Sequence, residues 1–310
     1  MMKTDKTIAV ITPVSHLDGV VELLKSKGNV FLYETANKLK VKQALLKHQI
    51  NTIVCNPNQQ TYKIDEELLG GTKVTLINSC STGLNHIDVN YCNDNNIKIQ
   101  CHKDDYELIN QLPSTSELAF GLMLSLLRKI PHSQEHVSKY NWDYTQFMGR
   151  QIKDLKIGII GYGRLGKIMG EYCKAFGAKI FIYDPYVNVP QISLNQMFQE
   201  CDVISLHVHV TDETKYMINK KLLGLSQKDL YIINTSRGEI VNELDVVNAL
   251  NTGKLTGYGT DVIENEFDDI TKSPIIKAMN KGENIIVTPH IGGMTIEGQT
   301  KAYKWSINKL

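Results

Sequence analysis

Three polar stretches follow apolar runs typical of buried strands, and each carries a side chain that could do chemistry. These side chains are Arg237, Glu266 and His290. An arginine can hold a carboxylate with two parallel hydrogen bonds, and a histidine can exchange a proton near neutral pH. Taken singly, an arginine can form a structural ion pair, an acidic loop is usually only solvated, and a histidine is more often structural.

A glycine-rich stretch, GYGRLG, separates an apolar run from a helical pattern, and a second apolar run then ends at Asp184. Gly161 allows a tight turn, Gly163 lets the backbone approach a pyrophosphate, and Gly166 lets the helix pack on the strand. The helix N-terminus attracts anions, and Asp184 stands where an acid can accept hydrogen bonds from an adenosine ribose. This order of elements predicts a dinucleotide site.

The dinucleotide site and the three polar side chains together suggest a reaction. Asp184 would repel the 2′-phosphate of NADP, and no arginine occurs between Arg164 and Arg237 to attract it, so NAD is the expected cofactor. Hydride transfer between NAD and a 2-keto or 2-hydroxy acid requires a cation for the carboxylate, a proton donor for the carbonyl oxygen and a carboxylate beside that donor. Arg237, His290 and Glu266 supply these groups.

Several motifs resemble, in the same order and over nearly the whole chain, the D-isomer-specific 2-hydroxyacid dehydrogenases, a family that includes phosphoglycerate dehydrogenase. The motifs are GIIGYGRLG, SLHVHVTDETKYMI, NTSRGEIVNELDVVNAL, GTDVIENE and TPHIGGMT. The resemblance implies that Arg237 binds the substrate carboxylate and polarises the carbonyl. It also implies that His290 gives a proton to the carbonyl oxygen during reduction and takes it back during oxidation. Glu266 would hydrogen-bond the imidazole and stabilise its protonated form.

Further site residues follow from the resemblance, residue by residue. The residues that it places at the cofactor are Gly161, Gly163, Arg164, Leu165, Gly166, Asp184, His207, Thr235, Asp261, His290 and Gly292. Asp261 would bind the nicotinamide carboxamide. The residues that it places at the substrate are Ser81, Thr82, Gly83, Arg237 and His290. Ser81–Gly83 matches a glycine-rich loop whose backbone N–H groups hold the carboxylate.

Apolar runs alternate with helical patterns along most of the chain, which predicts parallel sheets covered on both faces. The expected strands are 7–11, 30–33, 52–55, 74–78, 97–100, 157–160, 180–183, 203–207, 231–234, 255–260 and 285–288. The resemblance implies two doubly wound α/β domains: a Rossmann NAD-binding domain, residues 112–293, inserted in a flavodoxin-like substrate domain, residues 1–111 and 294–310. A helix over 115–129 is apolar nearly all round, so we expect it to be buried between the domains.

The composition argues against several classes of partner and site. The 34 basic and 33 acidic residues nearly cancel, which disfavours nucleic acid or an anionic membrane as a partner. No stretch is long and apolar enough for a membrane span or a signal peptide, and the 6 cysteines show no CxxC, so we expect a reduced, cytoplasmic protein. His207 and His209 could share one face of a strand, but no third ligand is evident, and no metal is expected.

Some departures from the family bear on substrate and partners. Phosphoglycerate enzymes often carry arginines near the positions of Cys55 and Ser79, neither of which is basic, so a D-3-phosphoglycerate or similar phospho-hydroxyacid dehydrogenase is the alternative. A non-catalytic, NAD-sensing corepressor of the same fold is a second alternative. Phe267 stands where the family usually has proline.

Two further expectations concern a subunit interface and a helix start. The aromatic-rich segment 131–150 suits a subunit interface, although packing on the chain's own domain is an equal alternative. The resemblance implies a homodimer formed through the NAD-binding domain. His86 and Asp88 follow the loop Ser81–Gly83, and we expect each of them to cap a helix or lie at the surface.

Overall fold

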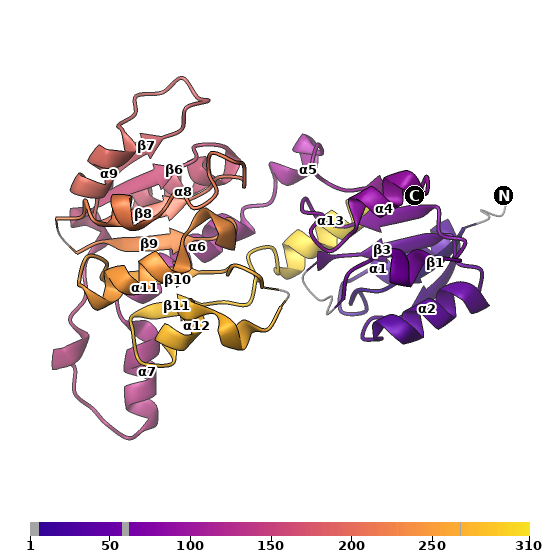
Figure 1. Ribbon diagram of the computed structural model, residues 1–310, viewed down its shortest axis with the longest axis horizontal. Coiled ribbons are helices and arrows are strands. Elements are labelled where there is room, and N and C mark those ends of the chain that lie inside the picture. Colours follow the sequence, from indigo (N-terminus) through magenta and orange to yellow (C-terminus); the bar gives the residue numbers. More distant parts are fainter. Residues whose placement is uncertain (1–5, 58–61, 228, 267) are drawn as a thin grey trace. The chain divides into compact units, whose positions relative to one another are not determined.

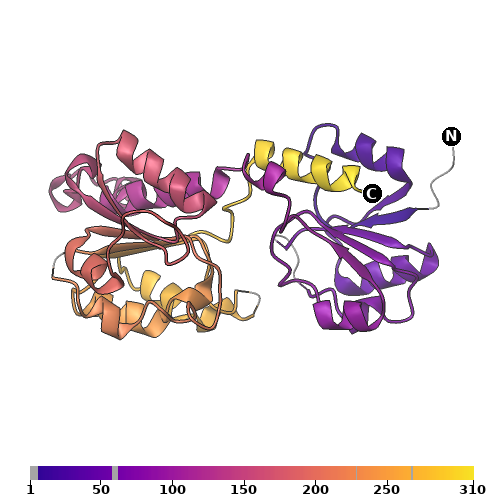
Figure 2. The same ribbon diagram turned by 90° about the horizontal axis from the view of Figure 1, so that it is seen from above.

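The computed structural model describes residues 6–57, 62–227, 229–266 and 268–310, and the chain divides into two compact units (Figures 1 and 2). Unit 1 comprises the chain up to residue 112 together with 293–310, and unit 2 comprises 113–292. Phe267 lies outside the described residues. Within these ranges, no helix combines the length and the apolar character that crossing a membrane requires.

Unit 1 is built on a parallel five-stranded sheet in the order β2-β1-β3-β4-β5, which is the flavodoxin-like order. Its strands are β1 (Thr7–Val10), β2 (Asn29–Leu32), β3 (Thr52–Cys55), β4 (Leu76–Ser79) and β5 (Lys98–Gln100). Its helices are α1 (Val20–Lys27), α2 (Lys38–Lys47), α3 (Glu66–Leu69), α4 (Val89–Asp94), α5 (Tyr106–Ile109) and α13 (Ile296–Asn308).

Alternating side chains of β1 serve the two faces of this sheet, as the period of a strand requires. Ile8 and Val10 are fully buried in a cluster with Tyr303 and Ile307 of α13. Ala9 faces the other way, into a cluster that α2, α3 and α4 cover. Helix α13 follows unit 2 in the sequence but completes the core of unit 1, where Figure 2 shows it in yellow beside indigo strands and helices.

Unit 2 is built on a parallel six-stranded sheet in the order β11-β10-β9-β8-β6-β7. Its strands are β6 (Lys156–Ile160), β7 (Lys179–Tyr183), β8 (Val203–Leu206), β9 (Tyr231–Asn234), β10 (Gly257–Thr260) and β11 (Ile285–Val287). Its helices are α6 (Ser114–Leu127), α7 (Ile130–Ser138), α8 (Arg164–Ala175), α9 (Leu194–Glu200), α10 (Lys220–Leu223), α11 (Glu243–Asn251) and α12 (Pro274–Met279). The strand order reverses between β6 and β8, and doubly wound folds bind ligands beyond the carboxyl ends of strands at such a point.

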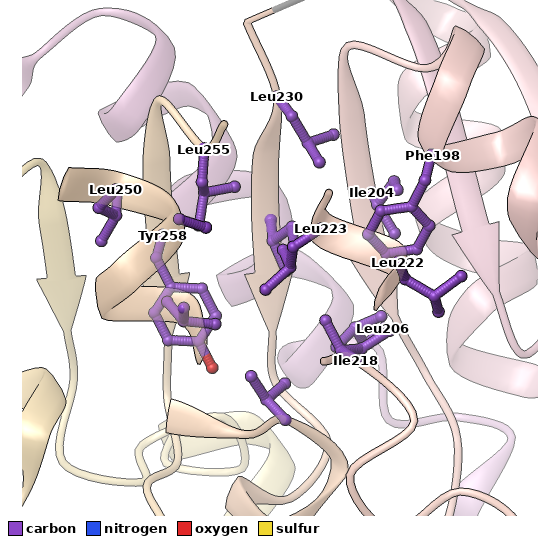
Figure 3. Close-up of a cluster of buried hydrophobic side chains, with 14 of the residues drawn as sticks. Phe198, Ile204, Leu206, Ile218, Leu222, Leu223, Leu230, Leu250, Leu255 and Tyr258 are labelled. Carbon is purple, nitrogen blue, oxygen red and sulfur yellow. The ribbon is translucent and has the colours of Figure 1, made fainter. Parts of the chain in front are cut away.

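Two hydrophobic clusters cover the faces of this second sheet. On one face, Phe198 of α9, Leu222 of α10 and Leu250 of α11 pack against strand residues that include Leu206 and Tyr258 (Figure 3). The other face is covered by α6 and α8, whose buried side chains meet those of β6 and β9. Both faces are therefore apolar, and polar side chains gather beyond the ends of the strands.

The two parallel sheets confirm the expected doubly wound α/β fold. Each expected strand corresponds to an observed one, although β8 ends at Leu206, before the histidine expected to continue it. The long apolar helix is α6, and its buried side packs on the sheet of unit 2 itself. Helix α7 was not expected, because it has no buried side chain and hence no apolar stripe to mark it.

Candidate active site

The glycine-rich turn after β6 leaves no room for side chains at two of its glycines. A Cβ on Gly161, whose φ is +87°, would lie 2.4 Å from the carbonyl oxygen of His207. A Cβ on Gly166 would lie 2.0 Å from the carbonyl oxygen of Gly161, so the absence of a side chain lets α8 pack on the turn. Gly163 precedes α8, and a Cβ there would meet nothing within 4 Å. The first backbone N–H groups of α8 are therefore approachable from the side of Gly163 and can bind an anion.

Asp184 follows β7 and holds this turn. Its Oδ2 accepts a hydrogen bond from the N–H of Tyr162 at 2.7 Å, and its Oδ1 accepts one from the N–H of Tyr186 at 2.9 Å. Each carboxylate oxygen has a further lone pair, so the contacts to the turn leave capacity for a ribose hydroxyl. Arg164 and Leu165 form the first turn of α8 and are half-buried, and burial lowers the pKa of Arg164.

A tight turn after β9 presents Arg237. The side chain of Asn234 spans the turn, because its Oδ1 accepts from the N–H of Ser236 and its Nδ2 donates to the carbonyl oxygen of Arg237, both at 3.0 Å. A Cβ on Gly238 would lie 2.1 Å from the carbonyl carbon of Ile263. The turn therefore packs directly against the loop that follows β10.

Arg237 and Thr235 have polar atoms whose hydrogen-bonding capacity the described residues do not fill. Arg237 is half-buried, and its Nη1 donates to the carbonyl oxygen of Ser236 at 2.7 Å. Arg150 pairs with Asp202 at 3.5 Å, whereas the described residues give Arg237 no ion pair. The Oγ1 of Thr235 is buried and finds no hydrogen-bonding partner among those residues. Such unused buried groups are typical of a ligand site.

His290 and Glu266 form a hydrogen-bonded pair. The distance from His290 Nδ1 to Glu266 Oε1 is 2.8 Å, and the side chains are 29% and 17% exposed. Because a carboxylate only accepts, Nδ1 carries the hydrogen, and Nε2 is the ring nitrogen whose protonation can change. The φ of His290 is +55°, a conformation that is costly for residues other than glycine. The surrounding structure must therefore impose it.

Asp261 supplies that constraint. Its Oδ1 accepts hydrogen bonds from the Thr288 hydroxyl at 2.6 Å and the Ile291 N–H at 2.8 Å, and its Oδ2 accepts from the Gly292 N–H at 2.7 Å. Its carbonyl oxygen accepts from the N–H of His290 at 2.9 Å. Burial raises the pKa of the Asp261 carboxyl. The sequence indicated a cofactor role for this residue but not its role in holding the turn that carries the histidine.

Glu243 is a second buried carboxylate that the sequence analysis missed. Its Oε1 accepts from the N–H of Glu264 at 2.9 Å, and its Oε2 accepts from the Ser273 hydroxyl at 3.0 Å. Burial raises its pKa. These contacts hold both sides of the loop that carries Glu266. Glu243 lies in the first turn of α11, where an acidic residue is favourable for the helix itself, so its sequence position gave no signal for this contact.

His207 lies beside the glycine turn and stays neutral. Its N–H donates to the carbonyl oxygen of Ile160 at 2.7 Å, and its Nε2 is 2.9 Å from the Ser205 hydroxyl. Burial lowers the pKa of His207 to about 4. His209 is exposed beyond the end of β8, so the two histidines do not share a strand face. The described residues contain no group of three or more histidine, cysteine or acidic side chains able to hold a metal ion.

The loop Ser81–Gly83 belongs to unit 1, whereas Arg237, Glu266 and His290 belong to unit 2. It follows β4, and its Thr82 is exposed. The Ser81 hydroxyl donates to the carbonyl oxygen of Gly83 at 2.9 Å, which closes the loop on itself.

Arg237, Glu266 and His290 follow β9, β10 and β11, which are neighbours in the sheet. Because the strands are parallel, these side chains emerge at the same edge. That edge offers a cation without an ion pair among the described residues, a histidine–carboxylate pair and a buried hydroxyl. Together with the glycine turn, it can bind an anion and move a proton.

The chain is similar to several known proteins. A family model described as the NAD binding domain of D-isomer specific 2-hydroxyacid dehydrogenases matches residues 120–292. A hydroxypyruvate reductase of Thermotoga maritima is 31% identical over 238 residues, which cover 74% of each chain. A D-3-phosphoglycerate dehydrogenase of Methanocaldococcus jannaschii is 29% identical over 301 residues, and the match spans 94% of this chain but about half, 54%, of that protein.

A solved structure extends the similarity to the whole fold. It is that of a D-lactate dehydrogenase from Aquifex aeolicus in complex with NAD and lactic acid. The TM-score is 0.75 at 28% sequence identity, and the alignment covers 97% of this chain and 93% of that one.

Proposed function

Because the chain belongs to the D-isomer specific 2-hydroxyacid dehydrogenase family, we propose that it reduces a 2-keto acid, or oxidises the D-2-hydroxy acid, with His290 as the proton-transferring group. Family membership makes the chain an NAD-dependent oxidoreductase. The observation that carries the proposal is the 2.8 Å contact between His290 Nδ1 and Glu266 Oε1, at the edge of the sheet that also presents Arg237.

The residues beside the glycine turn fit NAD. The open N-terminus of α8 suits a pyrophosphate, Asp184 has acceptor capacity for a ribose, and the unused Thr235 hydroxyl lies buried at the end of β9. We assign cofactor binding to these groups and to Asp261 and Gly292. When bound, NAD accepts or supplies the hydride at C2 of the acid.

The protein residues then have separate tasks. During reduction, protonated His290 gives its Nε2 proton to the carbonyl oxygen while C2 gains the hydride, so the keto acid becomes the hydroxy acid. During oxidation, neutral His290 takes the hydroxyl proton back, and Glu266 stabilises the resulting imidazolium. We assign binding of the substrate carboxylate to the guanidinium of Arg237 in unit 2. For unit 1, the family resemblance assigns carboxylate binding to the backbone N–H groups of Ser81–Gly83, which makes this unit the substrate domain.

Two observations favour a small acid without a phosphate. The positions where phosphoglycerate enzymes often carry arginine hold Cys55 and Ser79, which are fully buried here. Burial also raises the pKa of the Cys55 thiol well above its ordinary range, so this side chain stays uncharged. A phosphorylated acid would find no cation at these two positions.

We also propose that a second copy of the chain covers the segment 131–150. None of the side chains of helix α7 is fully buried, and Tyr140, Trp142 and Tyr144 after it are exposed, with Trp142 at 91%, whereas Phe147 is half-buried and packs against His136. An aromatic surface of this kind is typical of an interface. Light scattering coupled to gel filtration should report a dimer, and Trp142→Glu should shift it toward the monomer. A monomeric wild type would contradict this assignment.

The test of the main proposal is NADH oxidation with a panel of 2-keto acids: glyoxylate, hydroxypyruvate, pyruvate, branched and aromatic keto acids, and phosphohydroxypyruvate. We expect fast turnover of an unphosphorylated acid, with His290→Ala as the control that loses it. Preference for phosphohydroxypyruvate would favour the phospho-hydroxyacid alternative. Tight NADH binding without turnover of any acid would contradict the proposal and favour an NAD-sensing binding protein.

A further inference from the structure

A buried group of uncharged polar side chains lies under the loop Ser81–Gly83 of unit 1. Ser79 is fully buried at the end of β4, and its hydroxyl is 3.2 Å from Nε2 of His86 and 2.9 Å from the Ser81 hydroxyl. Cys55 Sγ, also fully buried, is 3.5 Å from the same Nε2. His86 is 3% exposed, so the expectation that it caps a helix or lies at the surface is wrong. Asp88 does cap a helix, because it accepts from the N–H of Tyr91 at 3.0 Å.

The hydrogen bonds of this group have one consistent direction. The Ser81 hydroxyl gives its only hydrogen to the carbonyl oxygen of Gly83, because a carbonyl cannot donate. Ser81 must then accept from Ser79, and Ser79 in turn must accept from Nε2–H of His86. The resulting hydrogen-bond chain runs from the ring of His86 through the hydroxyls of Ser79 and Ser81 to the backbone of the loop. The opposite direction would leave two oxygens in contact at 2.9 Å without a hydrogen between them.

The surroundings of His86 keep its ring in the neutral form that the hydrogen-bond chain requires. Burial lowers the pKa of His86 to about 4, so the ring carries one hydrogen at ordinary pH. The direction above places that hydrogen on Nε2. Nδ1 is then an acceptor, and it finds no hydrogen-bonding partner among the described residues. The ring therefore does not exchange protons in the reaction but acts as a fixed donor.

Backbone contacts hold the same loop from both sides. The Cys80 N–H donates to the carbonyl oxygen of Cys55 at 2.8 Å, and the His102 N–H donates to that of Ser81 at 2.9 Å. The carbonyl oxygen of His86 accepts from the N–H of Ile64 at 2.8 Å, which fixes the segment after the loop. The orientation of the Gly83 peptide group then depends on the hydrogen-bond chain that ends on its carbonyl oxygen.

We infer that Ser79 and His86 are positioning residues that orient the backbone of Ser81–Gly83 for the substrate carboxylate. The inference rests on the proposed function, which gives the loop its ligand. A peptide group turned away by a missing hydrogen bond would lose part of its contact with a carboxylate. Because such a contact is present in both the ground state and the transition state, its loss raises KM more than it lowers kcat.

The test compares four variants of the full chain with the 2-keto acid that the wild type reduces fastest. Ser79→Ala and His86→Leu interrupt the hydrogen-bond chain, and each should raise KM by about 2- to 10-fold, the range of one net hydrogen bond. The kcat and the NADH affinity should change little. His86→Gln places an amide N–H near the position of Nε2 and should restore KM. Thr52→Val is the matched control, since the hydroxyl of Thr52 is buried in unit 1 and donates to Asn51 Oδ1 at 3.0 Å, outside the hydrogen-bond chain.

Hydrogen exchange of the loop amides provides a second readout that does not depend on turnover. Exchange at residues 80–84 should speed up in Ser79→Ala and His86→Leu but not in His86→Gln or Thr52→Val. Wild-type KM and wild-type loop exchange in both interrupting variants would overturn the inference. If the wild type reduces no 2-keto acid, the proposed function fails, and the exchange measurement still decides whether Ser79 and His86 hold the loop.

Discussion

Two histidine–carboxylate pairs with nearly the same geometry lie in different units. In unit 2, His290 Nδ1 is 2.8 Å from Glu266 Oε1, and in unit 1, His102 Nδ1 is 2.9 Å from Asp105 Oδ2. The side chain of His290 is 29% exposed, whereas that of His102 is 2% exposed. Asp105 also accepts hydrogen bonds from Lys309. The distance between the partners therefore does not distinguish the two pairs.

Access and the remaining contacts do distinguish them. His102, Asp105 and Lys309 join the segment after β5 to the end of α13, so this pair fastens one part of unit 1 to another. Burial lowers the pKa of His102 despite the neighbouring carboxylate. His290 instead stands beyond the end of β11 in a left-handed conformation that Asp261 maintains. A histidine–carboxylate pair indicates proton transfer only where a substrate can reach the ring.

Removal of the exposed imidazole should give the largest difference between the pairs. His290→Ala should lower kcat by about 10²- to 10⁴-fold, because the carbonyl oxygen loses its proton donor. Single-turnover rates of NADH oxidation measure the loss, and NADH fluorescence shows whether the cofactor still binds. A decrease of less than about tenfold would mean that another group transfers the proton.

Neutralising the carboxylate of the same pair should have a smaller effect. Glu266→Gln keeps a hydrogen-bonding side chain but removes the charge that stabilises the imidazolium. We expect kcat/KM to fall about 10- to 100-fold, since a hydrogen bond to a charged group contributes about 1.5–3 kcal/mol. Glu264→Gln is the matched control, because this nearby carboxylate accepts from the Tyr216 hydroxyl instead. Equal losses in the two variants would contradict a specific role for Glu266.

The buried pair should respond in stability rather than in rate. His102→Leu removes the imidazole from Asp105, which leaves the carboxylate with Lys309 and should lower the free energy of unfolding by about 1–3 kcal/mol. Urea titration measures this change. The kcat should stay close to that of the wild type. A large loss of kcat in a folded His102→Leu protein would break the distinction between the pairs.

Acid should destabilise both units through histidines outside these pairs. Burial lowers the pKa of His86 in unit 1 and of His207 in unit 2 from 6.5 to about 4. Each histidine is neutral in the folded protein, but in the unfolded chain it binds a proton below pH 6.5. The free energy of unfolding is therefore highest above pH 6.5 and decreases as the pH falls toward 4. We expect each histidine to lower the free energy of unfolding by up to about 3 kcal/mol over this pH range. Urea titrations between these pH values measure the free energy of unfolding. Its decline with falling pH should be shallower in His86→Gln than in the wild type, and an equal decline would contradict this prediction.

The sequence predicted the two sheets because both depend on short apolar runs between glycines and polar turns, which are local signals. Helix α7 was missed because its exposed side chains follow no apolar period. Helix α6 was recognised, but its composition could not show that its buried side packs on the sheet of unit 2.

The candidate site could be predicted where a side chain lies a few residues after the end of a strand, as Arg237 and His290 do. The contact between Glu266 and His290, 24 residues apart, depends on β10 and β11 being neighbours, and the family motifs supplied that information. The role of Asp261 in the turn could not be read, because its partners lie about 30 residues later, at Ile291 and Gly292. His86 was misplaced because a helix-start pattern does not show which side chain turns inward.

The position of α13 has a consequence for synthesis on the ribosome. Tyr303 and Ile307 cover one face of the sheet in unit 1, but they emerge only after residues 113–292 have been made. Domains generally fold as units during translation. Unit 2 can therefore fold while the cluster of unit 1 that contains Ile8 and Val10 still lacks the side chains of α13. A nascent chain stalled before residue 293 would carry a finished nucleotide-binding unit and an unfinished unit 1, whose apolar face a chaperone could bind.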